Sequence, residues 1–144
     1  MNKEFIKTKL NLIEKELSYL EEYKKFSFEQ IVEDYKKQAI IERLLERIIT
    51  RAVDINQHII SESLDKKQEM PNNYKDTFLR LVKFNIYPKK FAEQISKSVG
   101  TRNILAHDYD DIDYSLIYES VKDCLKDYHK YCDYLLKYIK LEDN

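Results

Sequence analysis

Residues 39–60 read AIIERLLERIITRAVDINQHII, and no other stretch of the chain indicates the fold class as clearly. Adjacent apolar pairs recur along it about one helical turn apart: Ile40-Ile41, Leu44-Leu45, Ile48-Ile49 and Ala52-Val53. Pairs at this spacing widen a helical stripe until two faces are apolar. We therefore expect a central helix, from about residue 28 to 66, that packs on both sides or against a second subunit.

The remaining sequence continues the helical pattern. One glycine and two prolines in 144 residues are too few for the many tight turns of a sheet protein. Apolar spacings of three and four predict further helices at about 3–25, 74–85, 88–98 and 113–140, and Gly100 is expected to end the fourth of the five. We predict an all-α, up-and-down bundle of about five helices, forming one domain over residues 1–144.

The composition narrows the class of protein. Charged residues make up 35% of the chain and hydrophobic residues 43%, as in globular proteins. The net charge of −1 lacks the basic surplus of a dedicated nucleic-acid binder, so any RNA-binding surface must be a local patch. No apolar run is long enough to cross a bilayer, and the N-terminus lacks the apolar stretch of a signal peptide. A soluble, cytoplasmic protein is expected.

The cysteine pattern agrees with that compartment. Cys124 and Cys132 lie on one predicted helix, about 12 Å apart along its axis, which is too far for a disulfide bond. We expect both to be reduced, structural thiols, as in cytoplasmic proteins.

The segment from residue 99 to 112 is the candidate functional region, because it is predicted to be irregular between the glycine and an aspartate cap. Its polar side chains include Arg102, Asn103, His107 and Tyr109. On a straight helix, positions 102 and 107 point about 140° apart around the axis. Either the helix breaks between them, or each side chain points into a cleft that a second subunit completes.

The stretch RNILAHDYDDID at residues 102–113 resembles HepT-like HEPN toxins, in which Arg-x4-His is followed by x-Tyr and Ile-Asp. Glu42-Arg43 and the stretch 52–60 also resemble the second helix of that family, so the similarity spans about residues 35–125. Members are ribonucleases paired with nucleotidyltransferase antitoxins of the MntA type.

The resemblance implies RNA cleavage at a homodimer interface, with no metal and no cofactor and with Arg102 and His107 as catalytic residues. Histidine titrates near neutrality and suits transfer of the 2′-hydroxyl proton, while arginine grips phosphate with two parallel hydrogen bonds. Asn103 is expected to orient the phosphate or to support the Arg102 backbone. No acid for the leaving oxygen is evident, and the candidates are His107 of the second subunit or water.

Tyr109 has a separate role in this resemblance. A tyrosine at that place in the family receives AMP units from the antitoxin. Added phosphates and bases next to His107 would fill the RNA site with bulk and like charge, and the toxin would be switched off.

Simpler interpretations stand beside each assignment. Arg102 and His107 could form a structural pair at a helix junction, and Tyr109 could be an ordinary packed aromatic. An acidic cluster follows the histidine, at Asp108, Asp110, Asp111 and Asp113. These carboxylates are expected to cap the last helix or to face the antitoxin in preference to binding metal.

The other histidines and the tyrosines of the last helix are interpreted as structural. His58 has Asp54 one turn before it, at a spacing that allows an ion pair, and His129 is expected on the surface. Tyr128, Tyr131 and Tyr138 share an apolar stripe and are expected in the core or a dimer contact, although tyrosines can also stack on bases.

Two other functions remain open from the sequence. The chain could be a catalytically silent HEPN module that binds a nucleotide or a partner through the same cleft. It could also be a plain helical interaction protein in which Arg-x4-His occurs by chance.

Overall fold

The computed structural model describes residues 1–64, 69–107 and 112–142, and every regular element in these ranges is helical. The α-helices are α1 (Lys3–Glu21), α2 (Phe28–Val32), α3 (Tyr35–Ser63), α4 (Tyr74–Arg80), α5 (Lys89–Ser96), α6 (Ser98–His107) and α7 (Tyr114–Glu142). Short 3-10 turns, η1 (Glu22–Lys25) and η2 (Leu81–Phe84), extend α1 and α4. The predicted all-α class is confirmed.

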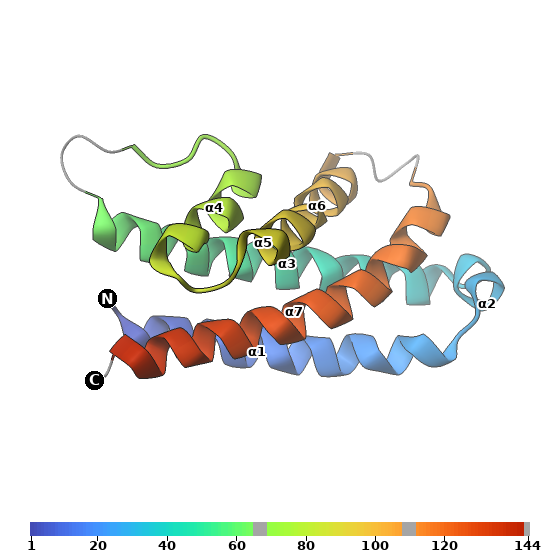
Figure 1. Cartoon of the computed structure of the whole chain (residues 1–144). Helices are drawn as coiled ribbons and strands as arrows, with labels where there is room; N and C mark the ends of the chain where they lie inside the picture. Colours follow the sequence, from blue (N-terminus) through green and yellow to red (C-terminus); the bar gives the residue numbers. More distant parts are fainter. Residues whose placement is uncertain (65–68, 108–111, 143–144) are drawn as a thin grey trace.

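Three long helices carry the core. In Figure 1, α1, α3 and α7 lie lengthwise against one another, and the short helices α4 and α6 pack on α3 from the other side. Helix α5 packs against α4, α6 and α7. The predicted apolar stripe of α3 is buried from Ile41 onward, with Leu45, Ile48 and Ala52 fully inaccessible to solvent, whereas Ile40 at its start is exposed. The expectation that α3 packs on both sides is met within one chain.

The predicted helix over residues 28–66 is wrong in its first part, because the chain breaks after α2. Asp34 caps a new helix: its carboxylate accepts hydrogen bonds from the backbone N–H groups of Lys36 and Lys37, at 3.0 and 3.2 Å. Ser27 and Gln30 form a capping box at the start of α2. These local hydrogen bonds favour two helices where the apolar spacing alone suggested one.

The segment expected to be irregular is also largely helical. Gly100 does not end a helix; it lies inside α6, its backbone is not left-handed, and its N–H donates to the carbonyl of Lys97 at 3.1 Å. The break falls earlier, at Lys97, between α5 and α6. Glycine ends a helix only where it adopts the left-handed conformation, so the residue type alone was misleading here.

A polar network lies within the core where α3, α4 and α7 meet. The buried hydroxyl of Tyr131 donates to Asn56 Oδ1 at 2.6 Å and lies 3.1 Å from the carbonyl oxygen of Ala52. Asn56 in turn donates through Nδ2 to Thr77 Oγ1 at 3.2 Å. Three elements distant in sequence are thus joined by satisfied buried groups, which specify their relative positions.

The remaining core predictions for α7 can be judged side chain by side chain. Tyr128 and Tyr131 are fully buried, as expected, and Tyr138 packs half-buried against the core. Cys124 and Cys132 are free and buried, which confirms that they are structural thiols. Among the described helices, none has the length and apolar character required to span a membrane.

Candidate active site

Helix α6 carries both predicted catalytic residues. It runs without a break from Ser98 to His107, anchored by the buried Leu105. An unbroken helix keeps positions 102 and 107 about 140° apart, so the two side chains leave the helix in different directions. The first of the two sequence-based alternatives, a break between them, is therefore wrong.

Arg102 is held by two residues from other helices. Its Nε lies 3.5 Å from Thr50 Oγ1 on α3, a long hydrogen bond, and its guanidinium carbon lies 5.1 Å from the ring centroid of Tyr74 at the start of α4. That distance is within the range of a cation–π interaction. The guanidinium is half-buried and oriented, with further N–H groups available to a ligand.

His107 is the last residue of α6 and is exposed to solvent. It makes no hydrogen bond or ion pair with the described residues. Asn103 is also exposed and points away from the core. Both side chains can therefore reach a ligand in solution, but neither forms a hydrogen bond with Arg102 within one chain.

The segment after His107 is described only in part. Tyr109, Asp108, Asp110 and Asp111 lie outside the described residues. Asp113 caps α7: its carboxylate accepts from the backbone N–H of Ser115 at 2.9 Å and from its hydroxyl at 2.6 Å. These hydrogen bonds lower the pKa of Asp113, and the bond from the Ser115 hydroxyl has the largest effect. The predicted capping role is confirmed for this residue.

The two remaining histidines have structural contacts. His58 does not pair with Asp54; its Nε2 accepts the backbone N–H of Asn2 at 3.2 Å, and its ring packs against Phe5. Asp54 binds Lys9 instead, at 3.2 Å, because α1 lies against this face of α3. His129 is exposed, as predicted, with Nδ1 3.4 Å from a Glu14 carboxylate oxygen.

The structure adds two residues that sequence reasoning missed. Thr50 follows the buried Ile48-Ile49 pair on α3, and Tyr74 is one of twelve tyrosines, so neither carried a distinguishing signal. Among the described residues, no group of three or more histidine, cysteine, aspartate or glutamate side chains is arranged to hold a metal ion.

Comparison with known proteins identifies the class of this fold. A solved tri-AMPylated HEPN toxin of Shewanella oneidensis, in complex with an MNT antitoxin, superposes with a TM-score of 0.81 at 25% identity, covering 95% of this chain and 99% of that one. YutE, a cytosolic protein of unknown function from Bacillus subtilis, shares the fold at a TM-score of 0.82 and 16% identity, over 99% of this chain and 93% of its own. The bundle is a HEPN-type domain.

The chain belongs to the HepT-like ribonuclease family, whose model (Ribonuclease HepT-like) matches residues 13–135. It is 34% identical to the tRNA nuclease HepT of Aphanizomenon flos-aquae, over 93% of this chain and 89% of that protein. It is 26% identical to the mRNA nuclease HepT of Shewanella oneidensis, over 72% of this chain and 76% of the relative. The resemblance inferred from residues 102–113 is therefore confirmed at the level of the family.

Proposed function

We propose that this chain is the toxin of a toxin–antitoxin pair, an endoribonuclease that cuts cytoplasmic RNA without a metal ion and uses Arg102 and His107. The observation that carries the proposal is the restraint of Arg102 by Thr50 and Tyr74, on the same helix that ends at the exposed His107. A structural arginine would be expected to pair with a carboxylate, whereas this guanidinium keeps N–H groups for a ligand.

The proposed chemistry needs only the RNA itself and these side chains. Neutral His107 removes the proton from a 2′-hydroxyl, and the oxygen attacks the adjacent phosphorus. The bond to the 5′-oxygen breaks, and that oxygen takes a proton from an acid, either His107 of the partner subunit or water. The products are a 2′,3′-cyclic phosphate and a free 5′-hydroxyl. Arg102 binds the phosphate and stabilises the charge that builds on it.

The direction of the two side chains supports a homodimer. Because α6 is unbroken, Arg102 and His107 of one chain diverge around its axis. In a two-fold dimer, the face of one subunit meets the same face of the other, so side chains from both copies can line one cleft. Asn103 is exposed on the same helix and would help to orient the phosphate.

The antitoxin is proposed to be a nucleotidyltransferase of the MntA type that adds AMP to Tyr109. Support comes from the solved HEPN toxin relative, which is tri-AMPylated and bound to an MNT antitoxin. Tyr109 follows His107 by two residues, so phosphates on its hydroxyl would lie near the histidine and repel RNA. Asp108, Asp110 and Asp111 would then face the antitoxin.

The catalytic proposal is tested with purified protein and by induced expression. Wild-type protein should cut RNA in the presence of EDTA, leave a cyclic phosphate, and fail on a substrate with a 2′-deoxy sugar at the cut. His107→Ala should lower the rate by about 10²–10⁴-fold and Arg102→Ala by roughly 10²–10³-fold, with growth restored in both. Unchanged toxicity of both variants, with the same melting temperature as wild type, would contradict the proposal and favour a silent module.

The modification is tested separately. Incubation with the cognate antitoxin and ATP should add AMP to wild type but not to Tyr109→Phe, as read by mass spectrometry. The Tyr109→Phe protein should still cleave RNA and should escape neutralisation. Modification of the phenylalanine variant at wild-type level would show that another residue is the target.

A further inference from the structure

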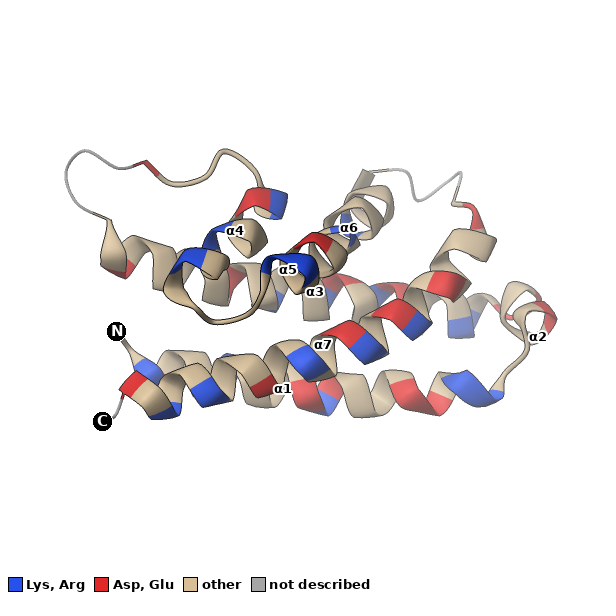
Figure 2. Cartoon of the chain, viewed as in Figure 1, with Lys and Arg blue, Asp and Glu red and all other residues tan. Residues whose placement is uncertain are grey.

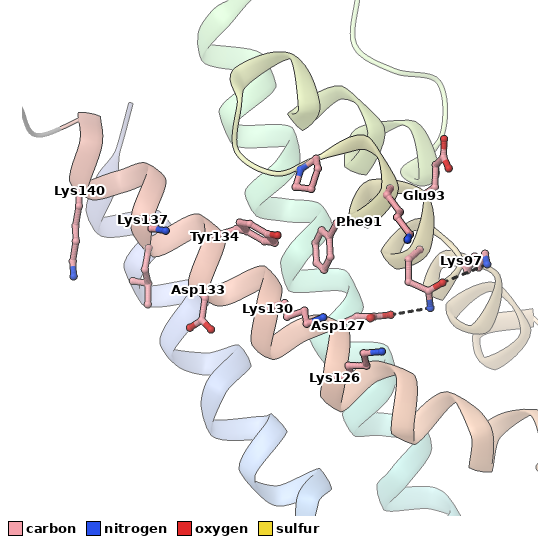
Figure 3. Close-up of a pocket in the computed structure, with 14 residues that line it drawn as sticks. Phe91, Glu93, Lys97, Lys126, Asp127, Lys130, Asp133, Tyr134, Lys137 and Lys140 are labelled. Atoms are coloured by element: carbon pink, nitrogen blue, oxygen red, sulfur yellow. Dashed lines mark hydrogen bonds between the residues drawn. The ribbon is translucent and has the colours of Figure 1, made fainter.

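A long groove runs between α5 and the C-terminal half of α7, away from the contacts that hold Arg102. It encloses about 1060 Å³ and is open to solvent. Figure 3 shows that the side chains along it come from both helices, with Phe91 of α5 facing Tyr134 of α7. Lys97, at the junction of α5 and α6, lies at one end, so the groove adjoins the helix that carries Arg102 and His107.

The groove is strongly basic for a chain whose net charge is −1. Six lysines line it: Lys90, Lys97, Lys126, Lys130, Lys137 and Lys140. Within the described residues, no carboxylate lies within ion-pair distance of Lys126, Lys130 or Lys137. Figure 2 shows the blue segments recurring along this half of α7. The lysines therefore form the local patch that a near-neutral nucleic-acid binder requires.

Three carboxylates also line the groove, and two of them have partners on α5. Glu93 pairs with Lys89 at 3.9 Å. Asp127 is only 6% exposed and accepts from Gln94 Nε2 at 3.4 Å. Burial is the main cause that raises the pKa of this carboxyl group. Glu93 and Asp133 are both exposed, so the lysines outnumber the exposed carboxylates of the groove six to two.

An aromatic pair lies among these cations. The rings of Phe91 and Tyr134 are tilted by 57° with centroids 5.0 Å apart, and both residues are half-buried. A positively charged groove that follows the backbone, combined with aromatic side chains on which bases stack, is how proteins bind single-stranded nucleic acid without sequence preference. A protein partner helix would instead be expected to meet a continuous apolar floor.

We propose that the groove between α5 and α7 is a second RNA-contact surface, which holds the substrate strand beyond the linkage that is cut. The assignment builds on the proposed ribonuclease function and adds a site that the catalytic residues do not require. The lysines contact phosphates, and the exposed parts of Phe91 and Tyr134 stack on bases. Binding there raises the affinity for long RNA without taking part in bond cleavage.

The test uses full-length protein carrying His107→Ala, so that the RNA survives the measurement. The triple variant Lys126→Gln, Lys130→Gln, Lys137→Gln is compared with a matched control, Lys7→Gln, Lys15→Gln, Lys36→Gln, whose lysines are exposed on α1 and α3. Fluorescence anisotropy with a single-stranded RNA of mixed sequence gives the affinity at several salt concentrations. Circular dichroism confirms that both variants melt as the parent does.

If the lysines contact phosphates, a plot of the logarithm of the RNA-binding constant against the logarithm of salt concentration becomes less steep in the groove variant. The slope changes by about 0.7 for each lost phosphate contact, or about 2 in total. The affinity near 0.1 M salt falls roughly 10- to 100-fold. The control variant binds as the parent does. Tyr134→Leu should weaken binding by at least about fivefold while leaving the salt slope unchanged. Equal affinity and slope in the groove and control variants would overturn the proposal.

A second measurement separates this site from catalysis. With His107 restored, the groove variant should cleave a dinucleotide at the wild-type rate but show a raised KM for long RNA. If RNA binding depends on the groove while the wild type cleaves nothing, the proposed catalysis fails and the groove assignment stands. If RNA binding is unaffected but affinity for the antitoxin falls, the surface is a protein interface and the RNA assignment is overturned.

Discussion

The guanidinium of Arg102 lies over the ring of Tyr74, with its central carbon 5.1 Å from the ring centroid. The two residues come from different helices, α6 and α4, and Thr50 of α3 adds a third contact at 3.5 Å. The direction of the arginine therefore depends on how three helices pack, and not on α6 alone. We expect changes in Tyr74 to act through the position of Arg102.

Replacing Tyr74 should alter RNA cleavage without unfolding the protein, because the side chain is partly exposed. Tyr74→Ala removes the ring, and a cation–π contact of about 0.5–1 kcal/mol corresponds to a two- to fivefold loss of rate. Tyr74→Phe keeps the ring face and should cleave at the wild-type rate. The comparison is a measurement of kcat and KM for all three proteins. Equal losses in the alanine and phenylalanine variants would show that the hydroxyl matters and that ring stacking does not.

Tyr131→Phe should destabilise the fold through a buried polar atom. Its hydroxyl donates to Asn56 Oδ1 at 2.6 Å in a fully buried site, so removal leaves an acceptor without its partner. The expected loss is about 1–3 kcal/mol in the free energy of unfolding, measured by urea denaturation. Tyr134→Phe on the same helix is the matched control, because its hydroxyl makes no hydrogen bond with the described residues. For that variant we expect the free energy of unfolding to fall by less than about 0.5 kcal/mol.

The two cysteines should be unreactive in the folded protein. Burial is the main cause that raises the pKa of Cys124 and of Cys132, and the thiolate is the reactive form. A thiol reagent such as DTNB should label neither residue under native conditions and both in denaturant. Rapid labelling of the native protein, at a rate independent of its stability, would mean that this face of α7 opens readily.

Asp113 should make the stability depend on pH in the acid range. The pKa of Asp113 is lowered in the folded state, chiefly by the Ser115 hydroxyl. Its carboxylate therefore contributes fully to folding stability at a pH above its pKa in the unfolded chain, and this contribution is lost as the pH falls through its pKa in the folded protein. Asp113→Asn keeps an acceptor for the helix cap but removes the titration. The melting temperatures of the two proteins should be similar at pH 7. Between about pH 4 and pH 2, the melting temperature of the wild type should fall more than that of the variant. Parallel pH profiles would contradict this assignment.

Much of the fold was predictable because apolar spacing reports which helical face is buried. The stripe of α7 and, apart from the exposed Ile40, the paired stripe of α3 lie in the core as expected. The errors arose where local backbone hydrogen bonds decide the outcome. Asp34 starts a new helix within a continuous apolar pattern, and Gly100 remains helical because its neighbours keep the right-handed conformation. Neither the helix start after Asp34 nor the helical conformation of Gly100 can be predicted from hydrophobic periodicity.

The candidate site was predictable only in part. The string at residues 102–113 indicated the family, which the family model confirms by matching residues 13–135. The catalytic roles of Arg102 and His107 stay a prediction. The partners of Arg102 could not be found this way. Thr50 and Tyr74 lie 52 and 28 positions away in the chain, and residues of these types are common on helices.

The order of apolar and polar side chains was sufficient to predict an all-helical bundle, reduced thiols and a polar segment that resembles HepT-like ribonucleases, because periodicity and motif spacing are local properties of the chain. The tertiary structure alone decided that α6 is unbroken, that Tyr74 and Thr50 orient the arginine, and that lysines of α5 and α7 share one groove. These features arise where helices distant in sequence come together, and their positions follow from packing of the whole core.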